Sequence, residues 1–311
     1  MPNCKVTILL LCVCLLVFFN SFSQQDPLFS QYHFNQLVIN PSYTGINNNT
    51  SIGVTSRFQW ISGLNGGTVE GNPITNTLTG QTTFLNNKVG IGALIVQDNL
   101  GISNNFEAHL TYSYKLTWLD KTLSFGLQTG MISVNYNYDA LSLKSLDDPV
   151  FQGSSLKGTK PNFGAGVAFM SDNMFIGLSA PRMLNTEFGD GITSSLRYQR
   201  HFYGSFAYLL NVNSILKFKP SVLLRLVEGA PVSYDLNGLL LINNAIWAGA
   251  YTRDLKTIGL MFQFDFSNAY RLGYNFELPL VTGLTQYSTH EFMFSIDLAL
   301  FGQQDVYQRY F

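Results

Sequence analysis

The chain has 311 residues, of which 18 are Lys or Arg and 19 are Asp or Glu, so its formal net charge is −1. Only 12% of the residues are charged, about half of the roughly 25% that is typical of soluble domains, whereas 46% are hydrophobic and 14% aromatic. The near-neutral charge gives no basic field for nucleic acid, and the apolar content is too high for a disordered chain. These figures leave an unusually apolar soluble protein or a membrane protein with dispersed apolar residues.

Residues 1–23 have the pattern of a secretory signal peptide. Lys5 supplies the positive charge, 6–19 form the apolar core, and the small residues Ser21 and Ser23 precede the expected cleavage site. This core is shorter than the roughly 20 residues that a spanning helix needs. All three cysteines lie within this segment. We therefore expect an exported mature chain without disulfides, thiolate metal sites or a cysteine nucleophile.

Beyond residue 23 the apolar residues repeat at every second position. Between 105 and 118, aromatic, aliphatic and alanine side chains occupy the even positions and polar side chains the odd ones. The same alternation recurs in 256–267, 269–279 and 290–301. Successive side chains of a strand point to opposite faces, so each segment has one apolar and one polar face. A soluble β-sandwich would alternate in the same way.

Two features favour a transmembrane barrel over a sandwich. The alternating segments reach 10 to 14 residues, whereas strands average about 5–6 and about 9–11 tilted residues cross a bilayer. Their polar faces also combine charges with Gly and Ser, as suits a lumen. We predict an all-β, transmembrane antiparallel β-barrel of about 14 strands. The predicted strands are 51–61, 75–85, 88–97, 105–118, 121–138, 161–170, 174–181, 196–210, 215–227, 231–242, 245–252, 256–266, 269–281 and 290–301.

The predicted connections fall into two classes. Six are tight and rich in Asn, Asp and Ser, which tolerate turn and left-handed backbones. These are 86–87, 119–120, 171–173, 211–214, 243–244 and 267–268. The others are mostly longer, at 62–74, 98–104, 139–160, 182–195 and 282–289, with short members at 228–230 and 253–255. Short periplasmic turns and longer extracellular loops are typical of outer-membrane barrels, so we expect both barrel ends on the periplasmic side.

The chain lacks the motifs of catalytic or metal chemistry. Its four histidines have no metal-ligand spacing, and no GxSxG motif is present. We therefore predict that the protein is not an enzyme and has no cofactor or metal site. Five charged residues on polar faces are predicted to face the lumen: Lys217, Lys219, Arg225, Arg271 and Glu277. They would either line a pore or neutralise one another in a plugged interior.

The segment before the first strand is dense in aromatic and turn residues. Pro27 interrupts it, and Asn40-Pro41 begins a turn that ends at Gly45. A disordered tail would not carry so many large apolar side chains. We expect a structured segment in the periplasm or in the lumen. The predicted divisions are a signal peptide (1–23), an N-terminal segment (24–49), the barrel (50–302) and a C-terminal tail (303–311).

This segment closely resembles the mature N-terminus of the PorP/SprF family of type IX secretion outer-membrane proteins. The resemblance is carried by Gln25-Asp26-Pro27, Phe29-Ser30-Gln31-Tyr32, Asn40-Pro41 and Gly45, and continues through Arg57-Phe58-Gln59-Trp60, Asp98-Asn99-Leu100-Gly101, Lys219-Pro220-Ser221, Arg271-Leu272-Gly273-Tyr274 and His290-Glu291. The chain departs from the family at Gln36, where many relatives have Pro or another residue. It also departs at Gln303 to Phe311, which continue past the usual final strand.

The resemblance implies a non-enzymatic barrel of the bacterial outer membrane that serves protein export. One branch of the family works with periplasmic ring and peptidoglycan-linked components, and the other is paired with a large secreted surface adhesin, as in gliding motility. The expected partners are therefore type IX secretion components, an adhesin or other cargo protein, and outer-membrane lipid, with no nucleic acid. The candidate partner-binding residues are Gln25, Asp26, Pro27, Phe29, Ser30, Gln31, Tyr32, Phe34, Asn40, Pro41 and Gly45. The alternative is a porin or a hydrophobic-solute channel.

Overall fold

A computed structural model describes most of the chain. The described residues are 29–62, 67–68, 71–138, 156–189, 195–267, 269–281, 283–301, 304, 306 and 309–311. The predicted signal peptide, the motif residues Gln25, Asp26 and Pro27, and most of the predicted loop 139–160 lie outside this part. Within the described residues, no helix is long and apolar enough to cross a membrane.

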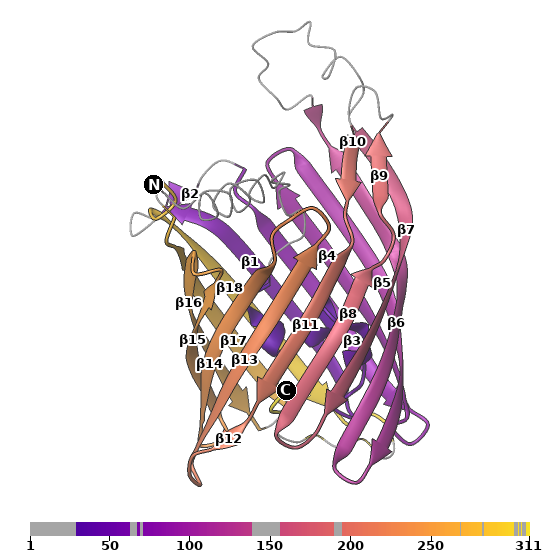
Figure 1. Cartoon of the computed structure of the whole chain (residues 1–311), viewed down its shortest axis with the longest axis vertical. Coiled ribbons are helices and arrows are strands. Elements are labelled where there is room, and N and C mark those ends of the chain that lie inside the picture. Colours follow the sequence, from indigo (N-terminus) through magenta and orange to yellow (C-terminus); the bar gives the residue numbers. More distant parts are fainter. Residues whose placement is uncertain are drawn as a thin grey trace, which may run out of the picture.

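Fourteen antiparallel strands form a closed ring (Figure 1), which confirms the predicted fold class and strand number. Around the ring they are β1 (Thr50–Ser62), β3 (Ile74–Phe84), β4 (Val89–Leu100), β5 (Ser103–Trp118), β6 (Lys121–Tyr136), β7 (Leu156–Met170), β8 (Met174–Arg182), β11 (His201–Tyr208), β13 (Leu216–Val227), β14 (Ser233–Ile242), β15 (Ile246–Arg253), β16 (Thr257–Phe266), β17 (Tyr270–Pro279) and β18 (Tyr287–Leu298). The pairings β1–β18 and β11–β13 complete the ring. Closure leaves no free sheet edge among these strands, as a structure surrounded by lipid requires.

Four shorter strands lie outside the main ring path. β2 (Gly67–Thr68) extends β1, and β12 (Leu210–Asn211) extends the β13 pairing. β9 (Thr186–Gly189) and β10 (Ser195–Tyr198) form a separate hairpin at one end of the barrel (Figure 1). Phe188 and Tyr198 of this hairpin pack on Ile132, Val134 and Leu156, which are buried apolar residues of β6 and β7.

Burial in the barrel wall is inverted relative to a soluble protein. In β5, Glu107 and His109 are 5% and 3% exposed, whereas Leu110 and Tyr112 are 65% and 45% exposed. The even, apolar positions therefore form the outer face and the odd, polar positions the inner face, as the alternation predicted. Such an apolar outer surface is stable only where hydrocarbon replaces water.

The tight turns use left-handed backbone. Asn86, Asn87, Asn243 and Asn244 have φ of 58°, 63°, 51° and 52°, a region that Asn adopts more readily than most residues. The connection at 98–104 is shorter than predicted, because β4 runs to Leu100 and β5 begins at Ser103. Its turn is made by Gly101, whose φ of 55° suits a residue without a Cβ.

The predicted strand 196–210 is wrong at its beginning. Residues 195–198 belong to the β9–β10 hairpin, and the wall strand β11 begins only at His201. The pairing of β11 with β8 also shifts register between His201 and Tyr203. Arg200 lies before the first residue of β11, so the alternation of the wall strand does not apply to it.

Candidate functional site in the barrel lumen

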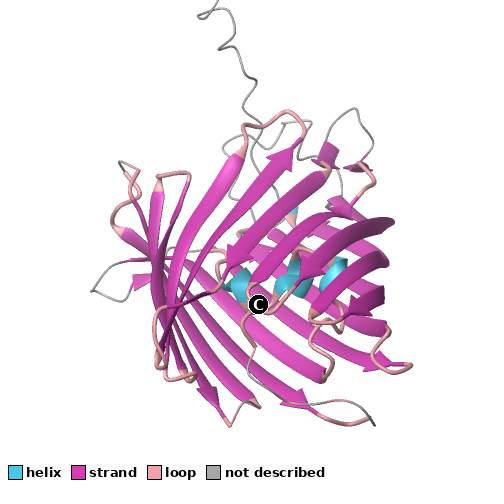
Figure 2. Ribbon diagram, turned by 60° about the horizontal axis from the view of Figure 1, so that its bottom comes forward, coloured by secondary structure: helices cyan, strands magenta, loops and turns pink. Residues whose placement is uncertain are grey.

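The described part of the N-terminal segment, Phe29–Asn49, lies inside the barrel. It forms three short 3₁₀ helices, η1 (Gln31–His33), η2 (Gln36–Val38) and η3 (Pro41–Tyr43), which Figure 2 shows within the ring of strands. Asn40 caps η3 because its side chain accepts a hydrogen bond from the Ser42 amide, and Pro41 occupies the first helical turn. We call Phe29–Asn49 the lumen segment.

The upstream end of the lumen segment is held by carboxylates of β17 and β18. The amides of Ser30 and Gln31 donate to the two oxygens of Glu291, at 3.0 and 2.8 Å. The Ser30 hydroxyl donates to Glu277 at 2.9 Å and accepts from Arg57 at 2.8 Å. One wall carboxylate thus satisfies two main-chain donors at the start of η1, where a 3₁₀ helix has no internal acceptor for them.

These contacts belong to a buried network of six charged side chains. Its members are Arg57, Arg225, Arg253, Asp235, Glu277 and Glu291, and each has at most 9% side-chain exposure. Arg57 bridges Glu277 and Glu291, and Arg253 bridges Glu277 and Asp235. Three positive charges therefore face three negative charges. Pairing of this kind offsets the cost of burying the charges.

The downstream half of the lumen segment is bound through its carbonyl groups. Four wall side chains donate to them: Ser179 to Ile39, Ser124 to Ser42 and Ser113 to Thr44, each at 2.6 Å, and Lys115 to Gly45. In addition, the Gly45 amide donates to Gln81 at 2.8 Å. The wall thus supplies the partners that a strand neighbour or a longer helix would otherwise supply.

Glycines in the wall make room for the lumen segment. A Cβ added to Gly90 would lie 2.2 Å from the Thr44 oxygen, and one added to Gly126 would lie 2.1 Å from the Ser42 nitrogen. Added at Gly166, it would lie 2.2 Å from Asn40 Oδ1, and at Gly273, 2.1 Å from Gln31 Oε1. These distances are far below van der Waals contact. At these four positions the segment lies too close to the wall main chain for any side chain to fit between them.

Aromatic residues of the lumen segment pack against the wall strands. The Tyr32 hydroxyl lies 3.0 Å from Asn237 Nδ2, and the Phe34 ring lies 5.9 Å from the ring of Trp247. His33 is 4% exposed. Its desolvation, together with the nearby Lys219, lowers the pKa of His33 to about 3, so the imidazole is neutral at physiological pH.

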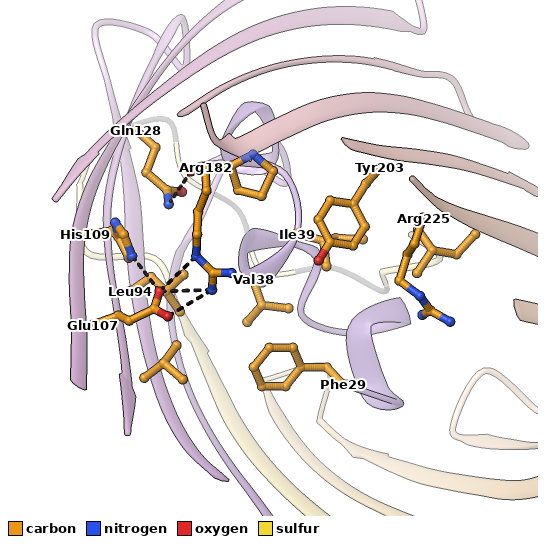
Figure 3. Close-up of a pocket in the computed structure, with 13 residues that line it drawn as sticks. Phe29, Val38, Ile39, Leu94, Glu107, His109, Gln128, Arg182, Tyr203 and Arg225 are labelled. Carbon is orange, nitrogen blue, oxygen red and sulfur yellow. Dashed lines mark hydrogen bonds and ion pairs between the residues drawn. The ribbon is translucent and has the colours of Figure 1, made fainter. Parts of the chain in front are cut away.

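A small cavity lies between the lumen segment and β5, β8 and β11. Figure 3 shows it bounded by Phe29 and Val38 of the segment and by Glu107, Arg182 and Tyr203 of the wall. Its volume is about 30 Å³, which accommodates only one or two water molecules. Arg182 donates two hydrogen bonds of 3.0 Å to Glu107, so the charges at its edge are paired.

The end of the chain also enters the lumen, on the side of the short turns. Arg309 pairs with Asp297, and the Phe311 ring stacks on Phe175 with a centroid distance of 6.2 Å. The main-chain oxygen of Phe311 accepts a hydrogen bond from Tyr43 of η3. The predicted C-terminal tail therefore contacts both the wall and the lumen segment.

The structure brings most of the candidate residues together. Those placed in the lumen are Phe29, Ser30, Gln31, Tyr32, Phe34, Asn40, Pro41, Gly45, Lys217, Lys219, Arg225, Arg271 and Glu277. Arg271 pairs with Asp297, and the two lysines contact Tyr310. Gln25, Asp26 and Pro27 lie outside the described residues.

Sequence reasoning missed four of the six members of the charged network. Arg57, Asp235, Arg253 and Glu291 were not among the candidates, although they share the parity of the polar face in their strands. Collecting every charged residue of that parity would have found them. Among the described residues, no group of three or more His, Cys, Asp or Glu side chains is arranged to hold a metal ion.

A closed ring of fourteen strands with an apolar outer face and a polar inner face defines an outer-membrane β-barrel. The family model described as type IX secretion system membrane protein PorP/SprF matches residues 21–296, and the chain belongs to this family. It is therefore an outer-membrane component of type IX secretion.

Solved structures with a similar fold are barrels. The CymD monoaromatic hydrocarbon channel has a TM-score of 0.51 and 10% identity, covering 89% of this chain and 94% of that one. A FadL homologue from Pseudomonas aeruginosa has a TM-score of 0.48 and 12% identity, and the match covers 91% of this chain and 96% of the homologue. Omp33 from Acinetobacter baumannii has a TM-score of 0.48 and 9% identity, and the match covers 82% of this chain and all of Omp33. At these identities CymD supports the fold alone. Comparison with curated proteins gives no match.

Proposed function

We propose that this barrel serves type IX secretion as a sealed docking component for an exported partner and does not itself conduct solutes. The partner class that the family resemblance favours is a large secreted surface adhesin or another cargo protein. The observation that carries the proposal is the lumen segment, which occupies the interior of the barrel and is bonded to its wall.

The fit of this segment supports a permanent seal. Its withdrawal would leave Glu291 without the two amide donors of Ser30 and Gln31, and would leave four segment carbonyls without their wall donors. Each such hydrogen bond contributes about 0.5–1.5 kcal/mol, and those to charged groups more. The glycines of the wall would then face an empty lumen, where nothing requires a residue without a Cβ.

The seal also bears on which residues a partner contacts. Phe29, Tyr32 and Phe34 pack inside the barrel, so a partner outside it cannot use them as aromatic anchors while the segment is in place. We assign them to the seal. Gln25, Asp26 and Pro27 remain the candidates for direct partner contact within the family motif.

The alternative function is a porin or a hydrophobic-solute channel. CymD is described as a monoaromatic hydrocarbon channel, and TodX as a toluene transporter. The likeness of their folds to this chain says nothing about its substrate. A channel function would require a continuous path past the lumen segment, whereas the segment leaves a cavity of about 30 Å³ beside β5 and β8.

Planar bilayer recordings with the purified protein test the proposal. The wild type should show no steady single-channel conductance. Gly126→Val places a side chain on the main chain of η3 and should open a conducting path. Gly80→Ala is the matched control, because a Cβ there meets no atom within 4 Å. Steady porin-like conductance of the wild type would overturn the proposal.

Surface display of cargo in cells tests the second part of the proposal, that the barrel docks an exported partner. Variants at Gln25, Asp26 and Pro27 should fold, as judged by heat-modifiable migration, and should lose display of the partner. Gly80→Ala should keep both. Normal display in the triple Ala variant would refute the assignment of these residues and leave the seal intact.

A further inference from the structure

Lys217 and Lys219 are two positive charges at the short-turn mouth of the barrel that the charged network does not use. Both project from the inner face of β13. Among the described residues, no carboxylate oxygen lies within 4.0 Å of either ammonium group. Lys219 is 1% exposed. A buried ammonium group without an anionic partner is costly, so its surroundings need an explanation.

The chain's own residues 309–311 occupy the space in front of these lysines. Lys217 donates to the Tyr310 hydroxyl at 2.6 Å, and Lys219 donates to the Tyr310 main-chain oxygen at 2.8 Å. The Lys217 ammonium lies 4.1 Å from the centre of the Tyr310 ring. The direct contacts of both ammonium groups among the described residues are thus neutral oxygens and aromatic faces, which bind an ammonium group more weakly than a carboxylate does, and Asp265 acts on Lys219 only from a distance beyond 4.0 Å.

The walls of this site are aromatic. Lys219 Nζ lies 4.5 Å from the Trp247 ring centre, 5.2 Å from that of Phe34 and 5.9 Å from that of Phe311. Phe311 in turn stacks on Phe175. We call the set Phe34, Phe175, Lys217, Lys219 and Trp247 the mouth site. Its chemistry selects an aromatic side chain with an acceptor, preferably anionic, close by.

The mouth site is open on one side. A cleft of about 710 Å³ begins at Lys217, Tyr310 and Phe311 and extends to the β5–β6 turn at Asp120 and the β7–β8 turn at Asn173. This volume is in the range of clefts that bind ligands. The residues at 310–311 fill only one end of it. A longer peptide that replaced them would therefore have a path out of the barrel.

We propose that the mouth site binds a peptide segment of a partner protein in which an aromatic residue is followed by a carboxylate, and that Tyr310 and Phe311 are the intramolecular occupant which this peptide displaces. The short turns of outer-membrane barrels face the periplasm, so the partner is a periplasmic protein or domain. This inference does not depend on the lumen segment leaving the barrel.

The test uses the full-length protein in detergent and synthetic peptides. The probe is acetyl-Arg-Tyr-Phe-Asp-amide, and its matched control has Asn in place of Asp. Quenching of Trp247 fluorescence reports binding, since Trp247 is 1% exposed within the site. The double variant Tyr310→Ala/Phe311→Ala, which removes both aromatic side chains of the intramolecular occupant, should bind the Asp peptide at least tenfold more tightly than the wild type does. It should also prefer the Asp peptide to the Asn peptide by about tenfold, the gain expected from one charge-assisted hydrogen bond.

Lys217→Gln in the double variant should remove this preference for Asp, whereas Lys256→Gln, an exposed lysine of the β15–β16 turn, should keep it. Tyr310→Phe, which removes only the hydroxyl that Lys217 contacts, is a milder variant and should raise affinity for the Asp peptide by a smaller factor. Heat-modifiable migration verifies folding of each variant. Equal binding of the two peptides, or equal binding by the wild type and both tail variants, would overturn the proposal.

Discussion

The barrel wall and the lumen segment are stabilised in opposite ways. The wall makes its main-chain hydrogen bonds between neighbouring strands, in unbroken registers such as the β5–β6 pairing from Ser103 to Trp118. The lumen segment has only three single-turn helices and relies on wall side chains such as Glu291 and Lys115 for its polar groups. The wall can therefore form without the segment, whereas the segment needs the wall to have this shape.

The largest expected effect comes from removing a carboxylate that joins the two regions. Glu291→Ala leaves Arg57 with one carboxylate fewer and two segment amides without an acceptor. Loss of one partner of a buried ion pair costs about 3–5 kcal/mol. The barrel should still migrate as a folded species, while chymotrypsin cleavage after Tyr32 or Phe34 should accelerate by two orders of magnitude or more.

The matched control for this change is Glu228→Ala, whose carboxylate is 62% exposed and pairs with Arg200 at 3.8 Å. It should leave the cleavage rate unchanged, because exposed ion pairs contribute little. If Glu291→Ala instead abolished folding of the barrel, the wall would depend on the segment and the contrast drawn above would be wrong.

His33 should give the lumen segment a pH dependence between pH 7 and pH 5. His33 is neutral in the packed segment with a pKa of about 3, and has a pKa of 6.5 in the absence of burial. The contribution of His33 to packing is therefore fully present above pH 6.5 and is lost as the pH falls from 6.5 toward 3. At pH 5 the free energy of segment packing has fallen by about 2 kcal/mol, because each pH unit below 6.5 costs about 1.36 kcal/mol.

Hydrogen exchange of the amides in 31–44, corrected for the intrinsic rate at each pH, measures this loss. The segment amides should exchange faster at pH 5 than at pH 7, and amides of β5 should not. Nearby Lys219 and Asp235 also influence His33, so the comparison is made with His33→Gln. If His33→Gln kept the full pH dependence of exchange, a group other than His33 would be its cause.

The smallest expected effect concerns a single hydroxyl. Ser124→Ala removes the donor to the Ser42 oxygen and should cost about 1 kcal/mol of segment packing, seen as a several-fold faster chymotrypsin cleavage. Thr117→Ala on the neighbouring strand is the control, since its hydroxyl makes only an exposed contact of 3.4 Å with Thr122. Equal rates for the two variants would mean that water replaces the lost donor.

Sequence alone predicted the wall far better than the lumen. Strand number, turn positions and the outer face follow from local alternation and from Asn-rich turns, which act over a few residues. Three wall features escaped it: the short turn at Gly101, the beginning of β7 at Leu156 within the predicted loop 139–160, and the start of β11 at His201, where the chain leaves a hairpin to join the ring.

The contacts within the lumen depend on which strands meet across the barrel. Ser30 and Glu291 are 261 positions apart, and alternation shows only that Glu291 faces inward. The wall glycines gave no signal either, since Gly126 and Gly166 read simply as small lumen residues until the segment is seen beside them. The aromatic motif of the segment indicated order but not its neighbours.

The attachment of Ser30 to Glu277 and Glu291 also constrains the order of assembly. The segment leaves the export machinery first, yet its acceptors lie 247 and 261 positions later in the chain. Contacts of such high sequence separation form late, after the entropy of closing the intervening loop has been lost. The Ser30 end of the segment can therefore be fixed only when β17 and β18 have joined the wall, whereas the end at Thr44 and Gly45, whose partners lie 36 to 70 positions later, can pack before the ring closes.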